Sequence, residues 1–237
     1  MTITPENRVP GRSFLLRKIF SGAVVALLTL AVLLFLPAGR LDWIEAWAYM
    51  AAYLVFLIVF VAWVIKNDPD LLEERSRVGS NARGWDRIIL GVSMVLLLST
   101  LILDGLDGGR FHRSSASVFL IGLGWLGLVL AAILIFWVVK TNTFASRFAR
   151  IQEDREQRVI STGPYHFVRH PMYAGMIVLF LCTSLALGSL WGLFPAALAG
   201  VLFFIRTGLE DRMLRKELAG YEDYVRQVRY RLIPGVW

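Results

Sequence analysis

The chain has 237 residues, 57% of them hydrophobic, and a formal net charge of +7. This length is enough for one sizeable soluble domain, but the apolar residues are concentrated in long uncharged runs, whereas a soluble helix would show a polar stripe at every turn. The single cysteine, Cys182, lies inside such a run. This excludes a disulfide framework within the chain and a metal site built from several cysteines.

Five segments contain no Asp, Glu, Lys or Arg, namely 19–39, 46–65, 88–103, 114–139 and 171–205. A charge at the centre of a bilayer costs roughly 2.5–3.5 kcal/mol, so charge-free runs of this length predict membrane-spanning helices. We expect the first to be a retained helix rather than a signal peptide, because it lacks a small-residue cleavage pattern.

The last run has 35 residues, far more than one helix needs to cross a hydrocarbon core of about 30 Å. We expect it to fold back at 187–190 into two rather short spans, with Pro195 bending or delaying the second. The sequence thus predicts an all-α transmembrane bundle of about six spans. Beyond residue 205, apolar residues recur at helical spacing and predict a cytosolic amphipathic helix; they are Leu214, Leu218, Tyr221, Val225 and Val228.

The basic residues predict the orientation of this bundle. With six spans, both termini and the loops near 66–87 and 140–170 share one side, which carries 22 of the 25 Lys and Arg. The positive-inside rule places that side, with both termini, in the cytosol. Contact of these basic loops with anionic membrane lipids explains the net charge, and no nucleic-acid partner is expected. We expect the charged loop 66–87 to be a solvated face.

We expect the chain to divide into an N-terminal transmembrane scaffold, residues 1–113, with about three spans, and a core, residues 114–237, with about three more. The core contains nearly all the residues whose type and spacing indicate binding or catalysis. One motif in the core is misleading. Residues 122–127 match the dinucleotide pattern G-x-G-x-x-G, but they lie inside an uncharged run with no strand before them. We interpret these glycines as a packing face between membrane helices.

The densest group of functional residue types lies between residues 152 and 175. A turn at 161–164 is followed by Tyr165 and then by Arg169-His170-Pro171-Met172-Tyr173. Pro171 suits the first turn of a membrane helix, which places His170 at the water boundary. A basic, aromatic interface anchor would use the same residue types, so the composition alone leaves that alternative open.

A second group, Arg206, Glu210, Asp211 and Arg212, follows the last uncharged run. Arg206 and Glu210 are four residues apart and could simply pair with each other. The expected hairpin, however, returns Arg206 to the membrane face that carries His170, so two polar groups are predicted to converge beside lipid.

These residues carry a resemblance to a known family. Gly163-Pro164-Tyr165, the sequence VRHPMYAG at 168–175, Glu210-Asp211 and the closing Leu-Ile-Pro-Gly at 232–235 resemble the isoprenylcysteine carboxyl methyltransferase and phospholipid methyltransferase family over residues 140–237. The resemblance implies an S-adenosylmethionine-dependent methyltransferase without a metal. It implies a catalytic group of His170, Arg206 and Glu210, with Arg206 facing the substrate. The cofactor-binding residues it implies are Gln152, Arg158, Val159, Ile160, Tyr165, His170, Tyr173 and Glu210. The family's second glutamate is Asp211 here, and the sequence leaves its role open.

The acceptor implied is a lipophilic small molecule or a lipidated substrate. A carboxylate acceptor is already ionised and could be oriented by Arg206, whereas an amine must lose a proton, for which His170 or Glu210 are the available bases. The sequence does not decide between them, nor does it predict an oligomeric state. The alternatives are an NAD(P)H-dependent membrane reductase of the sterol-reductase type and a non-catalytic membrane scaffold.

Overall fold

The computed structural model describes residues 12–68, 83–114 and 116–237. Over these residues the chain is helical and contains no strand, which confirms the all-α prediction. A π-helix, Gly105–Phe111, extends α4, and two short 3-10 turns, Glu153–Arg155 and Gly163–His166, interrupt the long connection after α5. The α-helices are α1 (Arg12–Ala38), α2 (Ile44–Asn67), α4 (Gly84–Asp104), α5 (Val118–Thr141), α6 (Pro171–Ala186), α7 (Leu193–Glu217) and α8 (Tyr221–Gln227).

Five of the described helices, α1, α2, α4, α5 and α7, are long and apolar enough to cross a membrane. The sixth apolar helix, α6, has only 16 residues, or about 24 Å at about 1.5 Å per residue. It begins at Pro171, as expected, and ends at the predicted turn, where Gly188 adopts a left-handed φ of +78°. The polytopic helical bundle is therefore confirmed.

The prediction of two short spans is wrong for the second of them. Helix α7 runs for 25 residues, past Arg206 and Glu210 to Glu217. Pro195 lies in its first turn, where a proline removes no intrahelical hydrogen bond. The predicted C-terminal amphipathic helix is also divided, because Gly220 takes a positive φ of +78° and separates the end of α7 from α8. Its apolar side chains still face the protein, and Leu214, Tyr221 and Val228 share one buried cluster.

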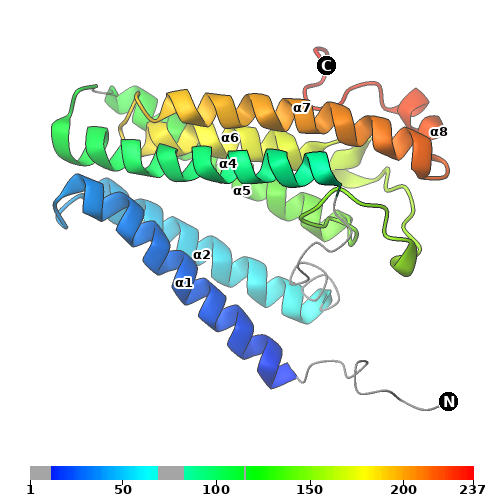
Figure 1. The fold of residues 1–237 in the computed structure, drawn as a ribbon, viewed down its shortest axis with the longest axis horizontal. Coiled ribbons are helices and arrows are strands. Elements are labelled where there is room, and N and C mark those ends of the chain that lie inside the picture. Colours follow the sequence, from blue (N-terminus) through cyan, green and yellow to red (C-terminus); the bar gives the residue numbers. More distant parts are fainter. Residues whose placement is uncertain (1–11, 69–82, 115) are drawn as a thin grey trace.

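Helices α4, α5, α6 and α7 lie side by side, with α5 packed along α6 and with α4 and α6 packed against α7 (Figure 1). We call the end of this bundle where α6 turns into α7 the hairpin end, and the opposite end, where α7 leads into α8, the site end. Helix α1 contacts the bundle through the π-helix at the hairpin end and diverges from it toward its own N-terminus (Figure 1).

Glycines allow close approach of α5 and α6. A Cβ at Gly124 would lie 2.5 Å from the backbone nitrogen of Ala186, and a Cβ at Gly127 would collide with Cys182 Sγ. Both residues belong to the G-x-G-x-x-G match, and both lie within α5, with no strand among the described residues that precede it. The motif is therefore a packing face, as expected for small residues between membrane helices.

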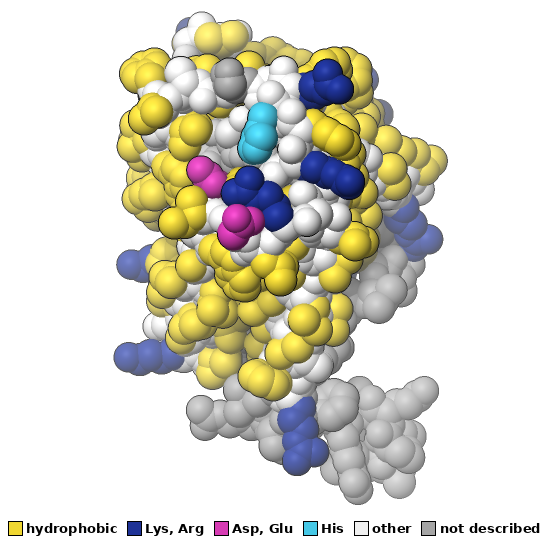
Figure 2. All heavy atoms as spheres, turned by 90° about the vertical axis from the view of Figure 1, so that its left-hand side faces the viewer, with side chains coloured by type: hydrophobic (Ala, Val, Ile, Leu, Met, Phe, Trp, Pro, Cys, Tyr) yellow, Lys and Arg dark blue, Asp and Glu magenta, His cyan; other side chains and the backbone are white. Residues whose placement is uncertain are grey.

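Buried polar contacts stabilise the hairpin end. Asp107 of the π-helix accepts hydrogen bonds from the backbone nitrogen of Ser114 at 2.8 Å and from Ser189 Oγ at 2.9 Å. The carboxylate thereby connects the end of α4 to the turn between α6 and α7. Seen from this end, apolar side chains cover the flanks of the molecule around a small group of charged ones (Figure 2).

The division of the chain at residue 113 stays a prediction. Helix α4, which that division assigns to the scaffold, packs along α7 of the core. Its first turn lies at the site end and contributes a buried carboxylate, that of Asp86.

Candidate functional site

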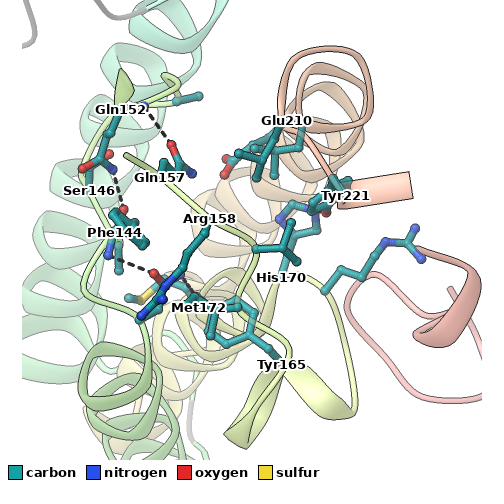
Figure 3. Close-up of a pocket in the computed structure, with 18 of the residues that line it drawn as sticks. Phe144, Ser146, Gln152, Gln157, Arg158, Tyr165, His170, Met172, Glu210 and Tyr221 are labelled. Atoms are coloured by element: carbon teal, nitrogen blue, oxygen red, sulfur yellow. Dashed lines mark hydrogen bonds between the residues drawn. The ribbon is translucent and has the colours of Figure 1, made fainter. Parts of the chain in front are cut away.

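A cavity at the site end lies between the connection from α5 to α6 and the last turns of α7 with α8 (Figure 3). The empty space within it, together with the solvent at its open mouth, is about 830 Å³. All eight residues expected to bind the cofactor line this cavity, although they come from three separate parts of the chain. They are Gln152, Arg158, Val159, Ile160, Tyr165, His170, Tyr173 and Glu210.

Gln152 stabilises the connection between α5 and α6 by three hydrogen bonds. Its Nε2 donates to the carbonyl of Phe144 at 2.7 Å, its backbone nitrogen donates to Gln157 Oε1 at 2.8 Å, and its Oε1 accepts from Arg155 at 2.8 Å. Since the side chain is only 1% exposed, these bonds offset the cost of burying its amide. Gln152 therefore shapes the wall of the cavity, with its side-chain amide engaged by the chain itself.

The Gly-Pro-Tyr turn places Tyr165 between two elements. Gly163 has a φ of +59°, and a Cβ there would lie 2.7 Å from Thr141 Oγ1, so both conformation and space require glycine. The phenol oxygen of Tyr165 accepts from Asn142 Nδ2 at 2.8 Å, and its carbonyl accepts from the hydroxyl of Tyr224 at 2.6 Å. Tyr165 is therefore held at the cavity by its hydroxyl, through Asn142 at the end of α5, and by its backbone, through α8.

His170 immediately precedes α6 and is oriented from several directions. Its backbone nitrogen donates to the carbonyl of Arg231 at 2.8 Å. Its ring stacks on that of Tyr173, with centroids 5.9 Å apart and planes inclined by 6°. Nε2 lies 3.4 Å from Asp211 Oδ1 and 3.3 Å from the Tyr221 hydroxyl. The imidazole therefore borders the cavity with one nitrogen turned toward a buried polar network.

Asp211 is the centre of that network. It is 0% exposed and accepts from Arg169 through both oxygens, at 2.8 and 3.2 Å, and from Arg231 Nε at 3.0 Å. Arg215 Nε lies 3.3 Å away, and the Tyr221 hydroxyl donates at 3.1 Å. Burial and the adjacent Asp211 carboxylate raise the pKa of Tyr221 well above its ordinary value, so its hydroxyl remains a donor. Asp211 connects α7 to the His-Pro motif and the C-terminal segment.

Glu210 and Arg206 have different surroundings despite their helical spacing. Glu210 lines the cavity and accepts a hydrogen bond from the Tyr173 hydroxyl. Arg206 is not one of the described residues that line the cavity. Its Nε donates to Asp86 Oδ1 at 2.7 Å, and its guanidinium lies over the Tyr173 ring, 4.9 Å from the centroid. Arg206 thus pairs with Asp86 rather than with Glu210, and its substrate-facing role stays a prediction.

Asp86 was missed by the sequence reasoning, which treated loop 66–87 as a solvated face. Most of that loop, residues 69–82, lies outside the described residues, but Asp86 is 0% exposed. The expectation is therefore wrong for Asp86, because the carboxylate has a buried cationic partner. A sequence signal was present, since Asp86 and Arg87 directly precede the uncharged run 88–103. Tyr224, which also lines the cavity, gave no separate signal.

Fold and site together define a polytopic helical membrane protein with a tyrosine-lined cavity of mixed polar and apolar side chains at one end of its bundle. Residues 119–219 match the phospholipid methyltransferase family, which confirms the resemblance to the isoprenylcysteine and phospholipid methyltransferase group. A comparison with curated proteins found no match. The matched segment contains α5 apart from its first residue, all of α6 and α7, and most of the cavity wall, and it leaves out α1, α2, α4 and α8. The match indicates a membrane methyltransferase.

Proposed function

We propose that this protein is an integral membrane methyltransferase that binds S-adenosylmethionine in the cavity and methylates a lipophilic acceptor carrying a carboxylate or an amine. The observation that supports this most is the convergence of the eight expected cofactor-binding residues on one cavity. The distribution of basic residues favours a cytosolic position for the site and for both termini.

The side chains of the cavity fit such a cofactor chemically. S-adenosylmethionine carries a sulfonium cation, an amino-acid group and an adenine. Glu210 supplies a carboxylate held by Tyr173, and tyrosine faces also attract cations. The exposed Arg158 guanidinium at the cavity wall suits a carboxylate, while Leu214 and Leu218 supply apolar surface for an aromatic ring.

When bound, the cofactor supplies an electrophilic methyl group, and alignment accounts for most of the rate in such a displacement. The protein's contribution is to hold the reactants. Tyr173 orients Glu210 at the cavity wall, and Asp211 with Tyr221 orients His170. An ionised carboxylate acceptor needs no base. An amine acceptor would have to give up a proton, and the imidazole of His170, held beside the Asp211 carboxylate, or the carboxylate of Glu210 could receive it.

The test is calorimetric titration of the purified protein in lipid nanodiscs with S-adenosylmethionine and, separately, with NADPH. We expect binding of the first alone, weakened at least about tenfold, or about 1.4 kcal/mol, by His170→Ala and by Glu210→Gln. Glu222→Gln on the exposed face of α8 is the matched control and should bind as the wild type does. Binding of NADPH alone would favour the reductase, and binding of neither would favour a scaffold.

A further inference from the structure

A buried ion pair between Asp86 and Arg206 holds one wall of the cavity in place through hydrogen bonds to its backbone. Asp86 Oδ1 accepts from Arg206 Nε at 2.7 Å, and Oδ2 accepts from the backbone nitrogen of Ala149 at 2.8 Å. Arg206 also donates to the carbonyl of Arg147 at 2.9 Å. The segment 147–149 is therefore held at two backbone positions by one ion pair that spans α4 and α7.

This segment belongs to the cavity wall. Ser146, Phe148, Ala149 and Arg150 all line the cavity. Ala149 is also part of the buried cluster that contains Leu214 and Tyr221, and Trp85, the neighbour of Asp86, packs against that cluster. Moving the first turn of α4 would thus move the loop that faces Tyr165 and His170 across the cavity (Figure 3).

The Asp86–Arg206 pair is also connected to Glu210, through Tyr173. The Arg206 guanidinium lies over the Tyr173 ring, and the Tyr173 hydroxyl donates to Glu210. Both side chains of the pair are nearly inaccessible, at 4% for Arg206 and 0% for Asp86. Apolar side chains of similar volume can pack helices together at least as stably as a buried ion pair. What this ion pair adds is orientation, because its hydrogen bonds place the backbone of Arg147 and Ala149 and its guanidinium lies against the Tyr173 ring.

We infer that Asp86 is a positioning residue of the cofactor site, acting through Arg206 and the backbone of 147–149. This inference rests on the proposed function. Asp86 lies outside the segment that matches the methyltransferase family, so helix α4 would complete the site from the N-terminal part of the chain. Arg206 then serves as the partner of Asp86 and the support of Tyr173.

The test compares Asp86→Asn with Asp107→Asn in the full chain in nanodiscs. Both carboxylates are buried and lie on the same continuous helix, but Asp107 is at the hairpin end. An amide at position 86 can accept only one of the two hydrogen bonds, because its NH2 group would face either Arg206 Nε or the Ala149 nitrogen. In calorimetric titration, we expect Asp86→Asn to raise the Kd for S-adenosylmethionine about tenfold and Asp107→Asn to leave it unchanged. Asp86→Glu, which keeps the charge, should recover part of the loss.

A second measurement does not depend on the cofactor. Hydrogen exchange of the ligand-free protein should become faster within 144–150 in Asp86→Asn and stay unchanged there in Asp107→Asn. If both variants lose thermal stability while the Kd for S-adenosylmethionine and the exchange of 144–150 remain as in the wild type, Asp86 is a structural residue and the inference fails. If the wild type binds no S-adenosylmethionine, the proposed function fails, and exchange alone decides whether Asp86 holds the loop. If Asp86→Asn does not fold, Asp86→Glu carries the same comparison.

Discussion

Removing the carboxylate of Asp211 should destabilise the protein strongly. Asp211→Ala leaves Arg169, whose side chain is 2% exposed, without the partner that neutralises it. Taking one member out of a buried ion pair costs about 3–5 kcal/mol, because the other charge stays buried. For a chain of 150–250 residues, each kcal/mol shifts Tm by about 2–4 °C, so the expected fall is about 6–20 °C.

The assay is thermal unfolding in detergent, followed by intrinsic fluorescence. The matched control is Asp223→Ala, which removes an aspartate from an ion pair with Arg226 that is 75% exposed on both sides. An exposed pair contributes about 0–1 kcal/mol, so the control should shift Tm by no more than about 4 °C. Equal shifts in the two variants would refute the idea that Asp211 is the centre of a buried network.

Two further predictions concern the tyrosines around the cavity. Tyr173→Phe removes the hydroxyl that donates to Glu210 but keeps the ring beside Arg206. Because a hydrogen bond to a charged group contributes about 1.5–3 kcal/mol, calorimetry should show the cofactor affinity falling about tenfold or more. Unchanged affinity would contradict the role given to Tyr173. Burial raises the pKa of Tyr221, so the folded state retains a proton that the unfolded state loses near pH 10. The free energy of unfolding should therefore decline as the pH rises above about 10. Chemical denaturation across that range should show a shallower decline in Tyr221→Phe, and an identical slope would count against the buried phenol.

The sequence by itself determined the apolar helices and eight of the residues that line the cavity. Runs without charge had to become helices in lipid, where backbone groups can be satisfied only internally. Gly188 and Pro171 then marked the end and the start of α6, because each favours a backbone conformation that ends or begins a helix. Short motifs shared with the family implied the eight cofactor-binding residues, and all of them line the cavity.

Only the tertiary structure decided which charges meet. Helical spacing allowed Arg206 to pair with Glu210, yet Arg206 turns to Asp86 on α4, 120 positions earlier in the chain, while Glu210 takes the hydroxyl of Tyr173. Asp211 likewise has cationic partners from 169, 215 and 231. Hydropathy and turn preferences act over a few neighbouring residues, whereas the partner of a buried charge depends on which distant segments packing brings within hydrogen-bonding distance.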